Sequence, residues 1–334
     1  MTSKLLQKIN SVEWLLADGA TGTNLFDMGL MSGDAPELWN ENYPEKIVKL
    51  YKDAVDAGSD IFLTNSFGSN ALRLKLHNSR NKAFKLSRIS AEIAREVADS
   101  HNKLVFVAGS VGPTGEIMQP IGDLSHELAV EVFHEQAQGL KEGGADLLWL
   151  ETISAPEEFK AAAEAFSHVK LPWVGAMSFD TAGRTMMGTS PAAMVDLISS
   201  IPNKPIAFGA NCGTGASDLL RTVQDFAKYS PKSILIAKGN AGIPKYIDGQ
   251  IHYDGTPELM AKYAIMARNS GAKIIGGCCG TKTEHLLSMR AALESEVLGS
   301  IPSLEQVELE IGPFSSQIKN ETKKRTTRRR ARRV

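Results

Sequence analysis

The sequence KIIGGCCG at residues 273–280 shows the unit from which the chain is built. A short apolar run is followed by two glycines, two adjacent cysteines and the sequence TKTE. We therefore expect a strand to end just before Cys278 and Cys279, and a helix to begin shortly after them. The only other cysteine, Cys212, also follows an apolar run and lies among glycines in GANCGTG, residues 209–215.

Three thiols in such positions have two interpretations. Free cysteines are often small buried apolar residues with no chemical role. Thiolates are also soft ligands that suit Zn²⁺, and three protein ligands with one open position form the arrangement of a catalytic zinc site. Because all three cysteines follow apolar runs and lie in glycine-rich loops, the sequence favours a zinc site.

Composition indicates a globular protein. The 334 residues are 43% hydrophobic and 22% charged. This length is enough for one large α/β barrel or two ordinary domains.

No apolar run approaches 18 residues, and the N-terminus lacks the apolar segment of a signal peptide, so we expect a cytoplasmic chain with no membrane partner. Three cysteines do not make a disulfide framework, and a reducing compartment keeps them available for metal. Homo-oligomers stay an open alternative.

The charge is distributed unevenly. Residues 319–334 contain nine Lys or Arg and one Glu, a net charge of +8, whereas the whole chain has −1, which leaves about −9 for the first 318 residues. A block of like charges typically stays disordered, and it could contact nucleic acid or the acidic body. We therefore expect a barrel over residues 1–311 and a basic, disordered tail over residues 312–334. The acidity of the body argues against nucleic-acid binding as the main function.

Eight short apolar runs alternate with stretches of helical periodicity. The runs are continuously apolar, as in strands buried on both faces of a parallel sheet. They lie at residues 14–18, 60–65, 104–110, 146–151, 173–178, 205–208, 233–238 and 273–275. Helices are expected from about residues 44, 81, 125, 155, 191, 217, 257 and 283 onward.

Eight β–α units in about 290 residues predict an α/β fold of the (β/α)₈ TIM-barrel type. An open doubly wound sheet would favour a Gly-x-Gly-x-x-Gly loop after the first strand, which DGATGT at residues 18–23 does not provide, and no Walker loop is present. In TIM barrels the catalytic residues come from the C-terminal ends of the strands. The residues at those ends are Asp18, Asn65, Ser110, Glu151, Ser178, Cys212, Asn240, Cys278 and Cys279.

These motifs resemble a known family. DGATGT after the first strand, TNSF at residues 64–67, NC at 211–212 and GGCCG at 276–280 are similar to the zinc-dependent homocysteine S-methyltransferases, over about residues 14–293. The chain looks more like the bacterial betaine-type members than like the animal ones. The resemblance implies a TIM barrel that transfers a methyl group to the zinc-activated thiol of homocysteine and makes methionine. It fits the chemistry of the residues, since a thiol bound to zinc is deprotonated at neutral pH.

The resemblance also implies roles for individual residues. Cys212, Cys278 and Cys279 would bind Zn²⁺ and so form the catalytic centre. The amino-acid part of homocysteine would be held by the acids Asp18 and Glu151, by the backbone N–H groups of Gly19 and Ala20, and by Asn65. The side chains of Asn211 and Asn240 are expected to orient the loops.

The methyl donor is the least determined feature. A donor with an onium group, glycine betaine first, is favoured, and it would contact the aromatic rings of Trp39 and Phe67. Gly68 stands after Phe67, where the animal betaine enzymes have a tyrosine, so the donor site differs from theirs. S-methylmethionine and a corrinoid-bound methyl group are the alternatives with the same fold and zinc chemistry. A nucleic-acid-associated protein with a basic tail is the alternative outside enzymes.

Overall fold

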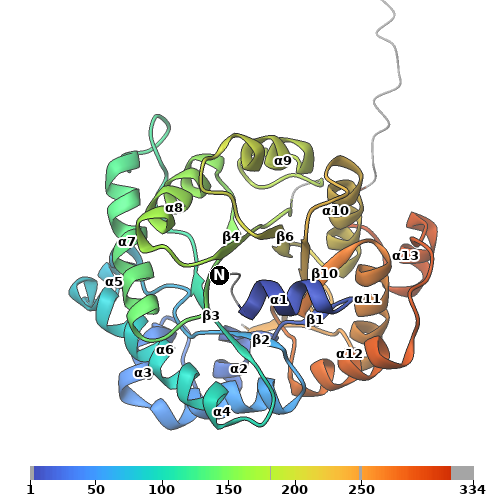
Figure 1. Cartoon of the computed structure of the whole chain (residues 1–334), viewed down its shortest axis with the longest axis horizontal. Helices are drawn as coiled ribbons and strands as arrows, with labels where there is room; N and C mark the ends of the chain where they lie inside the picture. Colours follow the sequence, from blue (N-terminus) through green and yellow to red (C-terminus); the bar gives the residue numbers. More distant parts are fainter. Residues whose placement is uncertain (1–3, 181, 248–249, 317–334) are drawn as a thin grey trace, which may run out of the picture.

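The computed structural model describes residues 4–180, 182–247 and 250–316 of the chain. Eight parallel strands form one sheet in the order β1-β10-β7-β6-β5-β4-β3-β2. A parallel bridge between Ala17 and Ile61 joins β1 and β2, the two edge strands in this order. It closes the sheet into a barrel, with helices around it (Figure 1). The (β/α)₈ barrel predicted from the apolar runs is confirmed.

Each predicted run overlaps one barrel strand. The strands are β1 (Leu15–Leu16), β2 (Ile61–Leu63), β3 (Phe106–Val111), β4 (Leu147–Ile153), β5 (Trp173–Met177), β6 (Ala207–Cys212), β7 (Leu235–Gly239) and β10 (Ala272–Gly277). Nearly all of their residues are buried, because side chains on one face fill the barrel and those on the other pack under the helices.

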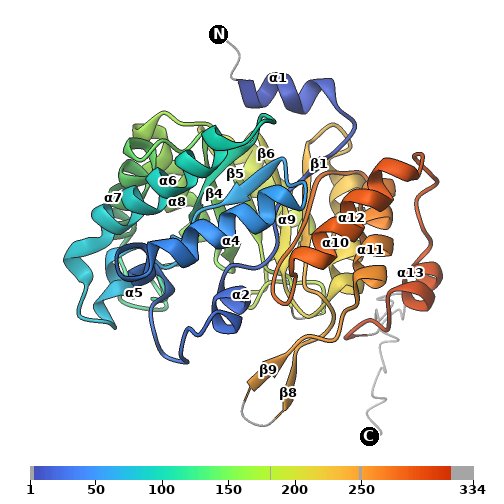
Figure 2. The ribbon, with the colours of Figure 1, turned by 90° about the horizontal axis from the view of Figure 1, so that it is seen from below.

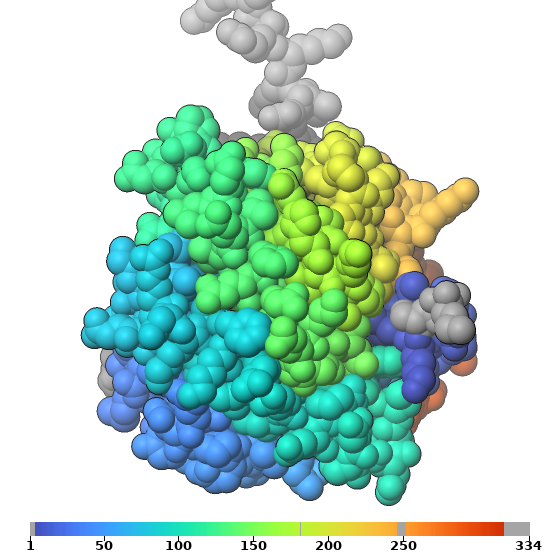
Figure 3. All heavy atoms as spheres, turned by 60° about the vertical axis from the view of Figure 1, so that its left-hand side comes forward, coloured from blue at the N-terminus to red at the C-terminus, as the bar shows by residue number. Residues whose placement is uncertain are grey.

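Eight helices follow the strands at the predicted places. They are α4 (Pro44–Asp56), α6 (Ala83–Ser100), α7 (His126–Glu142), α8 (Pro156–Val169), α9 (Pro191–Ser200), α10 (Ala216–Tyr229), α11 (Pro257–Asn269) and α12 (Thr283–Ser295). Four of them begin with proline, whose missing N–H costs nothing in the first turn. In the space-filling view the sequence colours follow one another from blue to yellow across one side of the molecule, as expected for consecutive helices that lie next to each other (Figure 3).

An additional helix closes the N-terminal end of the barrel. Helix α1 (Lys4–Ser11) lies across that end, opposite the face that carries the loops after the strands (Figure 2). Its buried side chains, Leu5 and Ile9, join the aliphatic cluster inside the barrel. The open end of the barrel is therefore the C-terminal one, where the predicted site residues lie.

Short elements extend the loops at the C-terminal end. After β1 come α2 (Gly22–Asp27), η1 (Pro36–Leu38) and α3 (Trp39–Asn42), and after β2 come α5 (Ala71–Lys75) and η2 (Arg80–Lys82). An antiparallel hairpin of β8 (Lys245–Ile247) and β9 (Gln250–His252) projects from the loop after β7 (Figure 2). Helix α13 (Leu304–Glu310) follows α12. The sequence did not predict these additions.

The sequence predicts no membrane span and a basic C-terminal tail. Within the described residues, no helix combines the length and the apolar character needed to cross a bilayer. Most of the basic tail, including every residue from 319 onward, lies outside the described residues.

Candidate metal and substrate site

The three cysteine thiols lie together at the C-terminal ends of β6 and β10. Register explains how two distant segments meet: Cys212 on β6 is opposite Gly239 on β7, and Gly239 is opposite Gly277 on β10. Cys278 and Cys279 follow directly, and the three Sγ atoms lie within 4.8 Å of one another.

The spacing of the thiols fits one zinc ion. The Sγ atoms of Cys212 and Cys279 are 3.9 Å apart. A tetrahedral Zn²⁺ with Zn–S bonds of about 2.3 Å separates its sulfur ligands by about 3.8 Å. All three cysteines are unpaired and half-buried. Three thiols and no carboxylate form a donor set that suits zinc rather than magnesium or calcium.

Asparagine side chains hold the cysteine loops in place. The Asn240 side chain donates to the carbonyl oxygen of Gly213 (2.8 Å) and accepts from the N–H of Cys279 (3.1 Å), so it joins both loops. The Asn211 amide contacts the Cys278 sulfur at 3.8 Å and bonds Thr152 through both of its ends. Both asparagines therefore contact the cysteine loops, for which the sequence predicts an orienting role.

The backbone is strained where it presents the first cysteine. Cys212 has a φ of 60°, in the left-handed region that residues other than glycine rarely adopt. The next residue, Gly213, has a φ of +75°, and a Cβ there would lie 2.9 Å from the carbonyl oxygen of Phe179. Strain of this kind persists only where the surroundings fix it, and it is common at functional sites.

The thiols share their protons unequally. Hydrogen bonds from Cys212 and Cys278 lower the pKa of Cys279, the group that holds the negative charge most readily. Hydrogen bonds to Cys278 and then to Cys279 raise the pKa of Cys212. The cluster is therefore arranged to keep one thiolate, to which a soft cation would bind.

A layer of buried charges lies inside the barrel at the same end. The Nζ atom of Lys238 is 2.5 Å from Oδ1 of Asp18, and these side chains are only 2% and 8% exposed. The other Asp18 oxygen, Oδ2, accepts from the N–H of Leu63 at 2.7 Å. Both Asp18 oxygens are therefore already occupied by the protein. Burial lowers the pKa of Lys238, but the carboxylates of Asp18 and Glu151 outweigh burial and raise it overall.

Glu151 differs from Asp18 in having one oxygen without a protein partner. Its Oε1 accepts from the Ser110 hydroxyl at 2.5 Å, whereas Oε2 accepts no hydrogen bond from any described residue. Burial raises the pKa of this carboxyl to about 7, and the nearby Lys238 ammonium opposes that rise. Glu151 can therefore accept a hydrogen bond from a ligand and gain charge when a cation approaches.

The other residues predicted to bind homocysteine already make contacts within the protein. Gly19 approaches Thr281 so closely that a Cβ there would lie 2.6 Å from its carbonyl oxygen, which explains the glycine. The Ala20 N–H donates to that same oxygen at 3.1 Å. The Asn65 side chain donates to the Pro36 carbonyl oxygen (2.8 Å) and to Asn40 (3.0 Å), so it ties the loop after β1 to the loop after β2.

Both predicted donor aromatics have basic residues beside them. Trp39 is 6% exposed, and the Lys46 ammonium lies 4.3 Å from its ring centroid. Phe67 is half-buried, with the Arg73 guanidinium 5.7 Å from its ring centroid. A Cβ at Gly112 would lie 2.6 Å from the Phe67 ring, so this ring also packs against backbone.

Two residues of the site were not predicted. Lys238 is the last residue of an apolar run, so a lysine at a strand end was the available signal. Tyr253 lies just after β9 and packs on Gly280, where a Cβ would be 2.3 Å from the Cβ of the tyrosine. Burial, and then the charge on Cys279, raises the pKa of Tyr253. No sequence signal places Tyr253, which follows the hairpin, beside the cysteines.

A parallel barrel with three thiols at its C-terminal end has the architecture of an α/β-barrel enzyme, and the thiols form a candidate metal site. Residues 15–293 match the family model described as homocysteine S-methyltransferase. The chain therefore belongs to the homocysteine S-methyltransferase family, as its motifs predict. It is 28% identical over 310 residues to methionine synthase from Mycobacterium leprae (strain TN). That alignment covers 86% of this chain and 25% of the relative, so the chain spans about a quarter of that protein.

Two solved structures of the homocysteine methyltransferase MmuM from Escherichia coli have the same fold. The oxidized form has a TM-score of 0.73 and 23% identity, covering 87% of this chain and 99% of that one. The metallated form has a TM-score of 0.72 and 24% identity, covering 86% and 99%.

Proposed function

We propose that this protein transfers a methyl group from an onium donor to the thiol of homocysteine, giving methionine. The observation that carries the proposal is the cluster of three thiols within 4.8 Å at the barrel mouth, in a chain of this family. A nucleophilic sulfur forms the new S–CH₃ bond while the donor's bond to that methyl breaks, and the donor keeps the electron pair. The thiol proton is lost before this step.

The metal site we propose consists of Cys212, Cys278 and Cys279. Zn²⁺ bound there would have a fourth position open to a substrate thiol, which would lose its proton at neutral pH. The protein supplies the geometry of the site: Asn240 fixes both loops and Asn211 lies against the Cys278 sulfur. The three thiols have to stay reduced, so we place the activity in the cytoplasm.

For the amino group of homocysteine we propose Glu151 as the direct partner. Its Oε2 atom has no protein donor, whereas both oxygens of Asp18 are taken by Lys238 and the Leu63 N–H. Asp18 then acts indirectly, because it holds the Lys238 ammonium near the Glu151 carboxyl. For the substrate carboxylate, the Gly19 N–H is the available donor of the predicted pair, because the Ala20 N–H already donates to Thr281.

Glycine betaine is the donor we favour, because the mouth offers complementary charges at two places. The thiolate cluster attracts the cationic end of a donor. On the other side, Arg73 lies beside the Phe67 ring and, among the described residues, has no carboxylate within ion-pair distance and no side-chain hydrogen bond. This guanidinium interacts electrostatically with the buried carboxyls of Glu37 and Glu158, and its N–H groups, which make no hydrogen bond within the described residues, suit a donor carboxylate. S-methylmethionine also has a carboxylate and is the second candidate, and a corrinoid-bound methyl group is the third.

A donor screen tests the proposal. The zinc-loaded protein and homocysteine are offered glycine betaine, S-methylmethionine and methylcobalamin in turn, and methionine is measured. We expect turnover with glycine betaine and an increase of its KM in Arg73→Met. Zinc-loaded protein that makes no methionine with any of the three donors would refute the proposed function, whereas turnover with another donor alone would correct the donor.

Glu151→Gln tests the substrate contact separately. This variant should retain zinc but bind homocysteine about ten-fold more weakly, because a hydrogen bond to a charged group contributes roughly 1.5–3 kcal/mol. Isothermal titration of the zinc-loaded protein with homocysteine measures this. Exposed Glu157, changed to Gln, is the matched control and should bind homocysteine like the wild type.

A further inference from the structure

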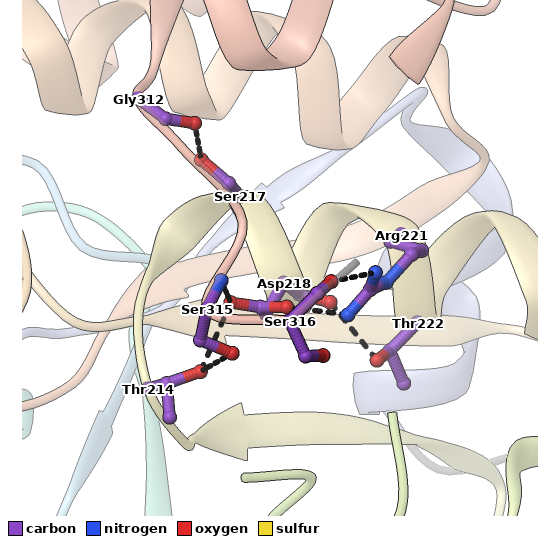
Figure 4. Close-up of polar contacts among 8 residues, drawn as sticks. All are labelled: Thr214, Ser217, Asp218, Arg221, Thr222, Gly312, Ser315 and Ser316. Atoms are coloured by element: carbon purple, nitrogen blue, oxygen red, sulfur yellow. Dashed lines mark hydrogen bonds and ion pairs between the residues drawn. The ribbon is translucent and has the colours of Figure 1, made fainter. Parts of the chain in front are cut away.

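The chain segment after α13 returns to the start of α10, next to the loop that holds Cys212. Residues 312–316, which we name the C-terminal clasp, lie along the first two turns of that helix (Figure 4). The Ser217 hydroxyl donates to the carbonyl oxygen of Gly312 at 2.7 Å. Phe314 packs on the main hydrophobic core. The clasp precedes the basic residues and is distinct from them.

Asp218 connects the clasp to the cysteine loop. Its Oδ2 atom accepts from the Ser315 N–H at 2.9 Å and from the Thr214 hydroxyl at 3.0 Å (Figure 4). Thr214 lies two residues after Cys212, so one carboxylate oxygen contacts both segments. The Thr214 hydroxyl is also 3.3 Å from that of Ser315.

Arg221 fixes the Asp218 carboxylate from the other side. Its guanidinium donates to Oδ1 of Asp218 at 2.5 Å and to the carbonyl oxygen of Ser316 at 3.2 Å. The same group lies 4.9 Å from the Phe314 ring centroid. Asp218 and Arg221 are 5% and 9% exposed, and a buried ion pair of this kind depends on having its remaining hydrogen bonds satisfied. The clasp supplies two of those partners, the Ser315 N–H for Asp218 and the Ser316 carbonyl oxygen for Arg221.

The cysteine loop needs this support because its backbone is strained. Cys212 and Gly213 both have positive φ. Asn240 holds the loop at Gly213, and Asp218 holds it at Thr214. The Asp218 carboxylate thus links the clasp to the Thr214 hydroxyl, two residues after Cys212.

We propose that the C-terminal clasp is a positioning element for the metal site, which fixes the Cys212 thiol through Ser315, Asp218 and Thr214. This inference rests on the proposed function, because it concerns the retention of the metal. It also implies that the 18 residues after Ser316 are dispensable for methyl transfer, whereas residues 312–316 are required.

Two truncations separate the clasp from the basic residues. A chain that ends at Ser316 keeps the clasp and loses the basic residues, and a chain that ends at Ile311 loses both. We expect the first to release zinc to a chromogenic chelator at the wild-type rate. The second should release it about ten-fold faster, a usual effect of losing a partner that orients a metal ligand. Equal rates for both truncations and the wild type would overturn the inference.

A matched pair of point variants excludes a merely structural role. Arg221→Met breaks the clasp. Arg268→Met is the control, since Arg268 is also buried and also holds a chain segment that follows a helix, through the carbonyl oxygens of Glu296 and Val297. Both variants should lower the melting temperature. Only Arg221→Met should speed zinc release, and only it should speed alkylation of Cys212 by iodoacetamide in the metal-free protein.

The same measurements distinguish failure of the inference from failure of the proposed function. If the full chain binds no zinc and makes no methionine, the proposed function fails, and the Cys212 alkylation rate still tests the clasp. If the full chain is active and the two arginine variants change zinc release and Cys212 alkylation equally, the clasp is only a stabilising contact and the inference is wrong.

Discussion

The two ends of the barrel interior are both buried but differ in chemistry. At the N-terminal end, aliphatic and aromatic side chains such as Leu15, Ile61 and Phe106 fill the barrel, and Ile9 of α1 covers them. At the C-terminal end, the space is occupied by the ionised pair of Lys238 and Asp18, with Glu151 near it. The fold is therefore stabilised mainly from one end, and the other end is available for chemistry.

The physical chemistry of burial explains this division. An apolar layer gains free energy for each methylene group that it removes from water. A buried ion pair gains little net stability, because desolvation of the charges offsets their attraction. Charges retained at such a cost, next to three thiols, are what we expect of residues that serve the proposed binding and catalysis. The following predictions test the contrast between the ends, from the largest effect to the smallest.

The largest effect is expected at the thiol cluster. Cys279→Ala removes one of the three proposed ligands, so bound zinc should fall from about one ion per chain to none, and methyl transfer should fall below detection. Elemental analysis and methionine production measure these two quantities, with circular dichroism as the control for folding. Full activity of a metal-free preparation would contradict the assignment of the site.

The buried charge layer should show the next largest effect. Lys238→Met leaves the Asp18 carboxylate without its ammonium partner, which should lower the free energy of unfolding by about 3–5 kcal/mol. Chemical denaturation measures this. The double variant Asp18→Asn/Lys238→Met removes both charges and should recover part of the loss. A double variant no more stable than Lys238→Met would mean that the charges are not coupled.

At the apolar end, Ile9→Ala should lower stability without changing the chemistry. Ile9 is fully buried inside the barrel end, and such a truncation costs about 2–5 kcal/mol. The KM values for homocysteine and for the donor should stay at the wild-type values, because α1 lies at the opposite end from the site. A changed KM would show that the two ends are coupled.

The sequence predicts the barrel well because its signal repeats eight times. Each apolar run overlaps one strand, and prolines and serines mark many helix starts. The additions at the C-terminal end lack such a signal. The hairpin of β8 and β9 is short and polar, and α1 is a single amphipathic helix that could have packed in several places.

The site is predicted only where a residue type is chemically unusual. Three cysteines at strand ends are informative from sequence, and the structure brings their thiols together. The sequence does not show which hydrogen-bond partner each side chain will have. That Asp18 is committed to Lys238, and that Trp39 is buried under Lys46, depends on which side chains meet across the barrel and its loops. The coupling of Asp218 to the chain end depends on contacts between residues about 97 positions apart.

The smallest effect concerns the pH dependence of the charged layer. Burial raises the pKa of Glu151 from 4.5 to about 7 in the metal-free protein. Between these values the folded protein keeps a proton that the unfolded chain releases, so the free energy of unfolding should fall as pH rises through this window and level off above pH 7. The whole fall is at most about 3.5 kcal/mol, since one pKa unit corresponds to roughly 1.4 kcal/mol. Glu151→Gln cannot titrate, so its curve should lack this fall, whereas the exposed control Glu157→Gln should follow the wild type. Denaturation of the three metal-free proteins at pH 5 and pH 8 measures the difference. A Glu151→Gln curve parallel to the wild type would show that this carboxyl is ionised throughout, and that the C-terminal end of the barrel tolerates its charges at less cost than its burial implies.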